Sequence, residues 1–147
     1  KHTEMTATQI LDEMKKYPAN FIVLTGGEPA LQIDDELIDI LHQNEYLIAI
    51  ETNGTHPLPK GIDWVTLSPK EGSEIVLAEA DEVKVVYTGQ NVERYRLEIE
   101  AECYYLQPCS RMKDGERVDN LKEVIDYCLK NPHWSLSLQT HKLINIQ

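Results

Sequence analysis

Five short polar clusters follow apolar runs in this sequence, and their residue types suit ligand binding. They are TGGEP at 25–29, ETNGT at 51–55, SPK at 68–70, QPCS at 107–110 and QTHK at 139–142. A glycine pair lets the backbone approach a ligand closely, a carboxylate accepts N–H donors, and a lysine pairs with anionic groups. If the fold brings these clusters together, they form a binding site for a small polar molecule.

Each cluster also has an ordinary structural interpretation. Gly26-Gly27 can turn its N–H groups toward an anion or a carboxylate, or simply connect a strand to a helix. Glu51 ends a buried run and needs a partner, such as a ribose hydroxyl or an amine, but it could equally cap the next turn. Lys70 is either an ion-pair partner or a solvated surface charge, and His141 is either a substrate hydrogen-bond donor or part of a polar tail.

The elements that must position these clusters follow an alternating pattern. Consecutive apolar runs such as FIVL and LIAI are typical of parallel strands buried on both faces, and segments with helical spacing lie between most of them. This alternation predicts an α/β fold in which the carboxyl ends of the strands, and thus the polar clusters, meet at one edge. The pattern does not distinguish a barrel wall from an open sheet. Strands are expected at 21–24, 46–50, 64–67, 83–87, 104–106 and 136–138, and helices at 6–17, 34–41, 73–80, 91–101 and 120–130.

Composition narrows the function classes. The 147 residues, which we expect to form one domain (1–147), carry 25 Asp and Glu against 14 Lys and Arg, a formal charge of −11 that argues against nucleic-acid binding. No apolar run approaches the ~20 residues of a membrane helix, so we expect no membrane association and a cytoplasmic location. Cys103, Cys109 and Cys128 form neither a paired framework nor a C-x-x-C motif, which argues against a disulfide scaffold and a zinc site.

Taken together, the motifs resemble the 7-carboxy-7-deazaguanine synthase branch of the radical S-adenosylmethionine (SAM) enzymes. GGEP is widespread in that superfamily, whereas SPK, QPCS and the terminal LSLQTHKLINIQ narrow the resemblance to this branch. The resemblance runs from about Ala19 to Gln147. It implies a partial (βα)6 TIM-like barrel of parallel strands, here missing its first strand and its cluster loop.

The resemblance also implies a role for individual residues. Substrate-binding groups would be Thr25, Glu51, His141 and the terminal carboxylate of Gln147, and no residue is implied as an acid or base catalyst. The implied SAM-binding residues are Gly27, Ser68, Pro69, Lys70, Gln107, Pro108, Cys109 and Ser110.

The implied activity is that of a carbon–nitrogen lyase of the radical SAM type. It would convert 6-carboxy-5,6,7,8-tetrahydropterin to 7-carboxy-7-deazaguanine by radical ring contraction, a step toward queuosine and related 7-deazapurines. The implied cofactors are SAM, a [4Fe–4S] cluster and Mg²⁺, and the implied partners are an electron donor such as flavodoxin and a second copy of the chain.

The three cysteines do not have the spacing of a [4Fe–4S] site. The family's cluster cysteines and magnesium ligand would precede Lys1, so we expect the chain to be the C-terminal two-thirds of the enzyme and inactive by itself. Two alternatives remain: another radical SAM enzyme of the activating type, and a non-catalytic SAM-binding module. Upstream cysteines ending in C-x-x-C-D-T would favour an enzyme over the module.

Overall fold

The protein is built on one six-stranded sheet whose strands are all parallel. A computed structural model describes residues 3–113, 116–140 and 144, and for 112–113 and 116–117 it describes the backbone alone. The strands run in the order β1-β2-β3-β4-β5-β8, and sequential strands are neighbours throughout. All six predicted strands are therefore present in a parallel α/β fold, as expected. Their bounds are β1 Phe21–Leu24, β2 Leu47–Thr52, β3 Trp64–Leu67, β4 Glu79–Tyr87, β5 Glu100–Pro108 and β8 Ser135–Leu136.

The described residues form four α-helices and one short 3-10 helix, and the first helix precedes β1. Thr6 begins the first helix in a capping box, in which its side chain accepts from the Gln9 N–H and the Gln9 side chain accepts from the Thr6 N–H. Asp34 caps the second by accepting from the Leu37 N–H at 2.9 Å. The helices are α1 Ala7–Met14, α2 Asp35–Gln43, α3 Glu93–Glu98 and α4 Leu121–Lys130, with the 3-10 helix η1 at Pro29–Leu31.

The predicted helix at 73–80 is wrong. This segment runs extended into β4, and Ile75 and Leu77, two positions apart, both pack against the core. A spacing of two is the period of extended chain, and the amide of Val76 bonds to the Gly54 carbonyl at 2.9 Å instead of to a helical turn. The helix predicted at 91–101 is also shorter than expected, because β5 already begins at Glu100.

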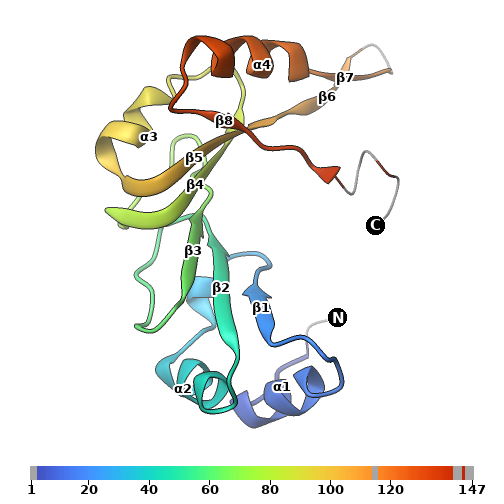
Figure 1. Ribbon diagram of the computed structural model, residues 1–147, viewed down its shortest axis with the longest axis vertical. Coiled ribbons are helices and arrows are strands. Elements are labelled where there is room, and N and C mark those ends of the chain that lie inside the picture. The colour runs from blue at the N-terminus through green and yellow to red at the C-terminus, as the bar shows by residue number, and fades with distance from the viewer. Residues whose placement is uncertain (1–2, 114–115, 141–143, 145–147) are drawn as a thin grey trace.

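A two-stranded antiparallel hairpin was not predicted. It consists of β6 (Ser110–Lys113) and β7 (Glu116–Asp119) and lies between β5 and α4. The hairpin extends away from the main sheet (Figure 1). It interrupts the regular strand–helix alternation, so β5 is followed by two extra short strands before its helix.

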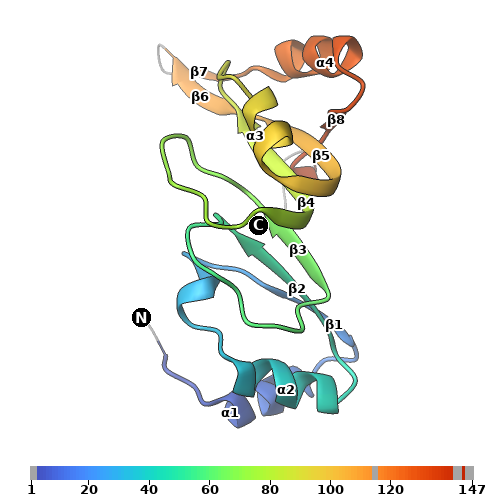
Figure 2. The ribbon, with the colours of Figure 1, turned by 90° about the vertical axis from the view of Figure 1, so that its left-hand side faces the viewer.

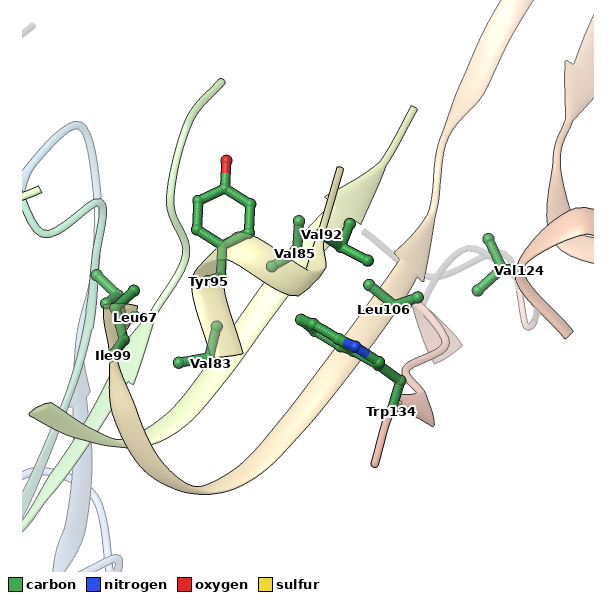
Figure 3. Close-up of a cluster of buried hydrophobic side chains, with 9 residues drawn as sticks. All are labelled: Leu67, Val83, Val85, Val92, Tyr95, Ile99, Leu106, Val124 and Trp134. Carbon is green, nitrogen blue, oxygen red and sulfur yellow. The ribbon is translucent and has the colours of Figure 1, made fainter. Parts of the chain in front are cut away.

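The helices cover one face of the sheet in two groups. Leu11 of α1 and Leu37, Ile38 and Leu41 of α2 pack with Ile48 of β2. The second core joins α3 and α4 to β3, β4 and β5; Figure 3 shows its nine buried side chains, Leu67, Val83, Val85, Val92, Tyr95, Ile99, Leu106, Val124 and Trp134. Two views of the ribbon place α1 and α2 at one end of the molecule and α3 and α4 at the other (Figures 1 and 2).

Strand register shows that both cores lie on the same side of the sheet. Thr52, two positions beyond Ile50, pairs with Leu67, which pairs with Val83, while Val85 pairs with Leu106. Side chains alternate along a strand, so the intervening residues must point to the opposite side. This opposite side carries Glu51, Thr66, Glu82, Lys84, Cys103, Tyr105 and Gln107, and we call these seven residues the polar face. Within the described part of the chain, no helix is long and apolar enough to cross a membrane.

Candidate functional site

The polar clusters lie at the carboxyl ends of the parallel strands, which share one edge of the sheet. TGGEP follows β1 and SPK follows β3. Glu51 is the next-to-last residue of β2. Gln107 and Pro108 end β5, Cys109 follows it, and Ser110 begins β6. The predicted convergence of these segments is therefore present in the fold.

Glu28 ties the loop after β1 to the loop after β2. Its Oε1 accepts from the Thr52 hydroxyl at 2.6 Å and from the Ala30 N–H at 3.1 Å, and its Oε2 accepts from the Asn53 N–H at 2.8 Å. Thr52 is only 2% exposed and ends β2, so this partly buried bond joins the loop after β1 to the end of β2. Hydrogen bonds to an ionised acceptor are stronger than neutral ones, and the two loops are thereby held in a fixed relation.

The loop after β2 is fixed in turn against β3. The Ser68 N–H donates to the Thr52 carbonyl at 2.7 Å, and the Gly54 N–H donates to the Thr52 hydroxyl at 3.1 Å. Gly54 has a φ of +78°, and a Cβ there would overlap the Leu67 side chain. Only glycine meets both requirements, which explains the glycine in the ETNGT cluster.

The backbone at Gly26 and Gly27 is open to a ligand. Gly26 has a φ of +134°, and a Cβ built at either glycine would meet no heavy atom within 4 Å. A cleft of about 900 Å³ reaches this loop from the segment before α1; its lining is both polar and apolar and includes Thr25, Gly26 and Gly27, but neither Glu51 nor Ser68. The cleft therefore marks the accessible side of the glycine loop.

Glu51 forms an ion pair across the polar face. The Lys84 ammonium lies 2.8 Å from Glu51 Oε1 and 4.0 Å from Glu82 Oε1. Lys84 and Glu82 are each 20% exposed at the side chain, whereas Glu51 is 44% exposed. The carboxylate of Glu51 is thus the accessible member of a partly buried cluster of three charges.

The pKa values of three groups on the polar face are raised, namely those of Glu82, Cys103 and Tyr105. Burial raises the pKa of Glu82, and the nearby Lys84 charge only partly opposes this effect. Burial, with the charge of Glu82, also raises the pKa of the Cys103 thiol. The pKa of Tyr105 is raised by Cys103 and by burial. Cys103 and Tyr105 therefore stay protonated near neutral pH.

Asn120 organises the end of β5. Its side-chain carbonyl accepts from the Cys109 N–H at 2.7 Å, and its amide donates to the Tyr87 carbonyl at 2.8 Å. The residue thus connects the ends of β4 and β5 to the start of α4. The QPCS segment is held by this bridge, and Gln107, which pairs with Val86, belongs to the polar face.

Two of the predicted substrate-binding residues, His141 and Gln147, lie outside the described residues.

Four residues of the site region were not predicted from the sequence: Glu28, Glu82, Lys84 and Asn120. The sequence could have placed Lys84 on the polar face, since a lysine between Val83 and Val85 in an apolar strand must point away from the helix-covered face. The roles of Glu28 and Asn120 depend on contacts between distant segments, which the sequence does not reveal.

The cysteines do not form a cluster site. None is in a disulfide, and the described residues contain no group of three or more His, Cys, Asp or Glu side chains placed to hold a metal ion. Burial raises the pKa of the Cys128 thiol as well as that of Cys103, which disfavours the thiolate that an iron–sulfur cluster requires. The open glycine loop and the polar strand ends, by contrast, fit a small polar cofactor such as SAM.

Several known proteins with a similar sequence carry the name of one enzyme. No family model matches the chain. A 7-carboxy-7-deazaguanine synthase from Bacteroides thetaiotaomicron is 51% identical over 145 residues, which is 99% of this chain and 75% of that protein. Enzymes of the same name from Nitratidesulfovibrio vulgaris and Bradyrhizobium diazoefficiens are 48% and 47% identical. The chain spans only 59% and 60% of those two proteins.

The fold comparison agrees. The crystal structure of QueE from Escherichia coli superposes with a TM-score of 0.70 and 28% sequence identity, covering 92% of this chain and 64% of that one. The similarity in sequence and the similarity in fold both extend over most of the described strands and loops. The chain belongs to the 7-carboxy-7-deazaguanine synthase family.

Proposed function

We propose that this chain supplies the SAM- and substrate-binding edge of a 7-carboxy-7-deazaguanine synthase. The reaction would convert 6-carboxy-tetrahydropterin to 7-carboxy-7-deazaguanine, a step toward queuosine. The observation that carries the proposal is the 51% identity to a synthase over 99% of the chain. The convergence of TGGEP, Glu51 and SPK at one edge of the sheet supports it.

The cofactor would lie along the loops after β1, β3 and β5. The open backbone at Gly27 would bind the methionyl amino group of SAM, Ser68, Pro69 and Lys70 would bind its ribose and carboxylate, and Gln107–Ser110 would flank the adenine and ribose side. When bound, SAM would supply the 5′-deoxyadenosyl radical that takes a hydrogen atom from the substrate. The protein residues bind, orient and exclude water.

The substrate would lie against the polar face. Glu51 would accept the guanidine-like N–H donors of the pterin ring through its exposed carboxylate, and Thr25 would face the same ring from the loop after β1. His141 and the carboxylate of Gln147 would close over it.

The electron for SAM cleavage would come from a [4Fe–4S] cluster, for which Cys103, Cys109 and Cys128 are not suitable ligands. A cytoplasmic location, a flavodoxin-type donor, Mg²⁺ and a homodimer belong to the same proposal and rest on the family resemblance. Light scattering on the purified protein tests the dimer directly.

The decisive experiment uses the protein expressed from its complete gene and reconstituted anaerobically with iron and sulfide. SAM, a reductant, Mg²⁺ and 6-carboxy-tetrahydropterin are added, and 7-carboxy-7-deazaguanine is measured by mass spectrometry. Formation of the deazaguanine is the expected result. Cleavage of SAM without that product would leave another radical SAM reaction, and no SAM cleavage would favour a binding module.

Glu51→Gln tests the division of roles within the site. It should weaken substrate binding by about 2–4 kcal/mol, because the negative charge is lost and one acceptor oxygen becomes an amide donor that faces the N–H donors of the substrate. SAM affinity should change less than about threefold. The two affinities are measured separately by calorimetry, and an equal loss of both would contradict the assignment of Glu51 to the substrate.

A further inference from the structure

Lys84 is not among the residues that sequence motifs assign to the site, yet it makes the shortest ion pair on the polar face. Its Nζ lies 2.8 Å from Glu51 Oε1. We propose that Lys84 is a positioning residue that holds the Glu51 carboxylate in the orientation in which it accepts the N–H donors of the substrate. This inference rests on the proposed role of Glu51.

Strand register explains how the two side chains meet. Glu51 pairs with Thr66, and Thr66 pairs with Glu82, so Lys84 lies two positions farther along β4 on the same face. The lysine therefore reaches diagonally across β3 toward β2. A long, flexible side chain spans this distance, and the ion pair restricts both partners.

Glu82 is a second and more distant partner of Lys84. Its Oε1 lies 4.0 Å from Lys84 Nζ, and both side chains are 20% exposed. The three groups together carry a net charge of about −1 when both carboxylates are ionised. Such a cluster favours ligands rich in N–H donors over anions, which agrees with a guanidine-like ring edge.

The ion pair leaves Glu51 able to bind a ligand. An ionised carboxylate offers about four lone-pair positions, and one bond from Lys84 occupies a single position on Oε1. Oε2 and the remaining position of Oε1 can still accept two parallel N–H donors. The 44% exposure of Glu51 means that, without Lys84, this carboxylate would rotate freely, and binding would have to restrict it.

The test compares Lys84→Met and Lys84→Arg in the protein from its complete gene. Lys84→Met should raise the dissociation constant for 6-carboxy-tetrahydropterin about 5- to 30-fold, the loss expected when one charge-assisted bond is removed from a partly exposed group. The constant for SAM should stay within about twofold. Lys84→Arg keeps the positive charge and should recover most of the affinity. Lys122→Met removes an 87% exposed lysine from α4 and is the matched control.

A double-mutant cycle separates positioning from general stability. If Lys84 acts through Glu51, adding Lys84→Met to Glu51→Gln should weaken substrate binding less than about threefold further. The inference would be overturned if the double variant raised the substrate dissociation constant by the product of the two single effects. It would also be overturned if Lys84→Met weakened SAM and substrate binding equally. If Lys84→Met fails to fold, Lys84→Gln replaces it in the cycle.

The outcomes also separate this inference from the proposed function. If Glu51→Gln leaves substrate affinity unchanged, the proposed role of Glu51 is wrong and that of Lys84 falls with it. If Glu51→Gln weakens binding and neither Lys84→Met nor Lys84→Gln does, only the inference about Lys84 is wrong.

Discussion

Glu28 joins two segments of the candidate site through its side chain. Its two carboxylate oxygens accept three hydrogen bonds, from Ala30, Thr52 and Asn53, and these bonds join two loops of the candidate site. The sequence pattern predicted that TGGEP and ETNGT lie at the ends of neighbouring strands. It did not predict the hydrogen bonds between them. Such bonds depend on side-chain rotamers and loop conformation, which strand patterns do not specify.

Glu28→Gln should separate the two loops. One of the two oxygens becomes an amide donor facing existing donors, so we expect a loss of about 1–3 kcal/mol in the free energy of unfolding. SAM affinity should fall as well, because Gly27 belongs to one of the loops. Urea denaturation and calorimetry measure the two effects, with Glu74→Gln, at an exposed position, as control. Unchanged SAM binding would show that the hydrogen bonds of Glu28 to Thr52 and Asn53 do not organise the glycine loop.

At the scale of elements, the strands were easier to predict than the connections. Strands such as β2 are continuous apolar runs, whereas 73–80 contains apolar residues that fit either period and becomes extended only through its contacts with the core. The position of Ser68 at the carboxyl end of a strand could be predicted from the sequence, because it directly follows the apolar run of β3, whereas Lys84 lies within β4 and was not predicted as part of the site.

Glu93 links α3 to α4 and to the segment before β8. It accepts from the Trp134 indole N–H at 2.7 Å and from the Tyr127 hydroxyl at 3.1 Å. Burial and the Glu93 carboxylate raise the pKa of Tyr127 to about 12. The neutral hydroxyl is thus the form that stabilises this junction.

Alkaline pH should weaken this junction. A pKa raised in the folded state gives stability that is present below the ordinary tyrosine pKa of about 10 and is lost as the pH rises through about 12. Tyr127→Phe should therefore destabilise the protein at pH 8, and its difference from the native protein should shrink between pH 10 and 12. Urea denaturation across this range tests the prediction. If the difference in unfolding free energy between the two proteins stays constant over this range, the ionisation of Tyr127 does not affect stability.

At the scale of the molecule, one sheet carries both cores. Leu41 lies in the core at α1 and α2, and Leu106 in the core at α3 and α4, and each is 0% exposed. Because strands of a single sheet connect these two cores, the cores should unfold in one cooperative transition. The alternation of strands and helices predicted this arrangement, but not that both helix groups would leave a polar face free on the other side.

Leu41→Ala and Leu106→Ala should each lower the free energy of unfolding by about 2–5 kcal/mol, the usual cost of emptying a buried site. Leu129→Ala, at a position 78% exposed, should change it by less than about 0.5 kcal/mol. Circular dichroism and tryptophan fluorescence should report one shared transition in urea. Two separate transitions would mean that the cores fold independently.

The two edges of the sheet differ in a way that affects how the protein behaves in solution. Among the described residues, β8 pairs along only two positions, whereas β1 presents a four-residue outer edge next to the exposed side chains of Phe21 and Val23. Main-chain groups on such an edge accept any extended segment of matching length. Concentrated samples should therefore associate first along β1, and a charged substitution at Val23 offers a direct way to keep them dispersed.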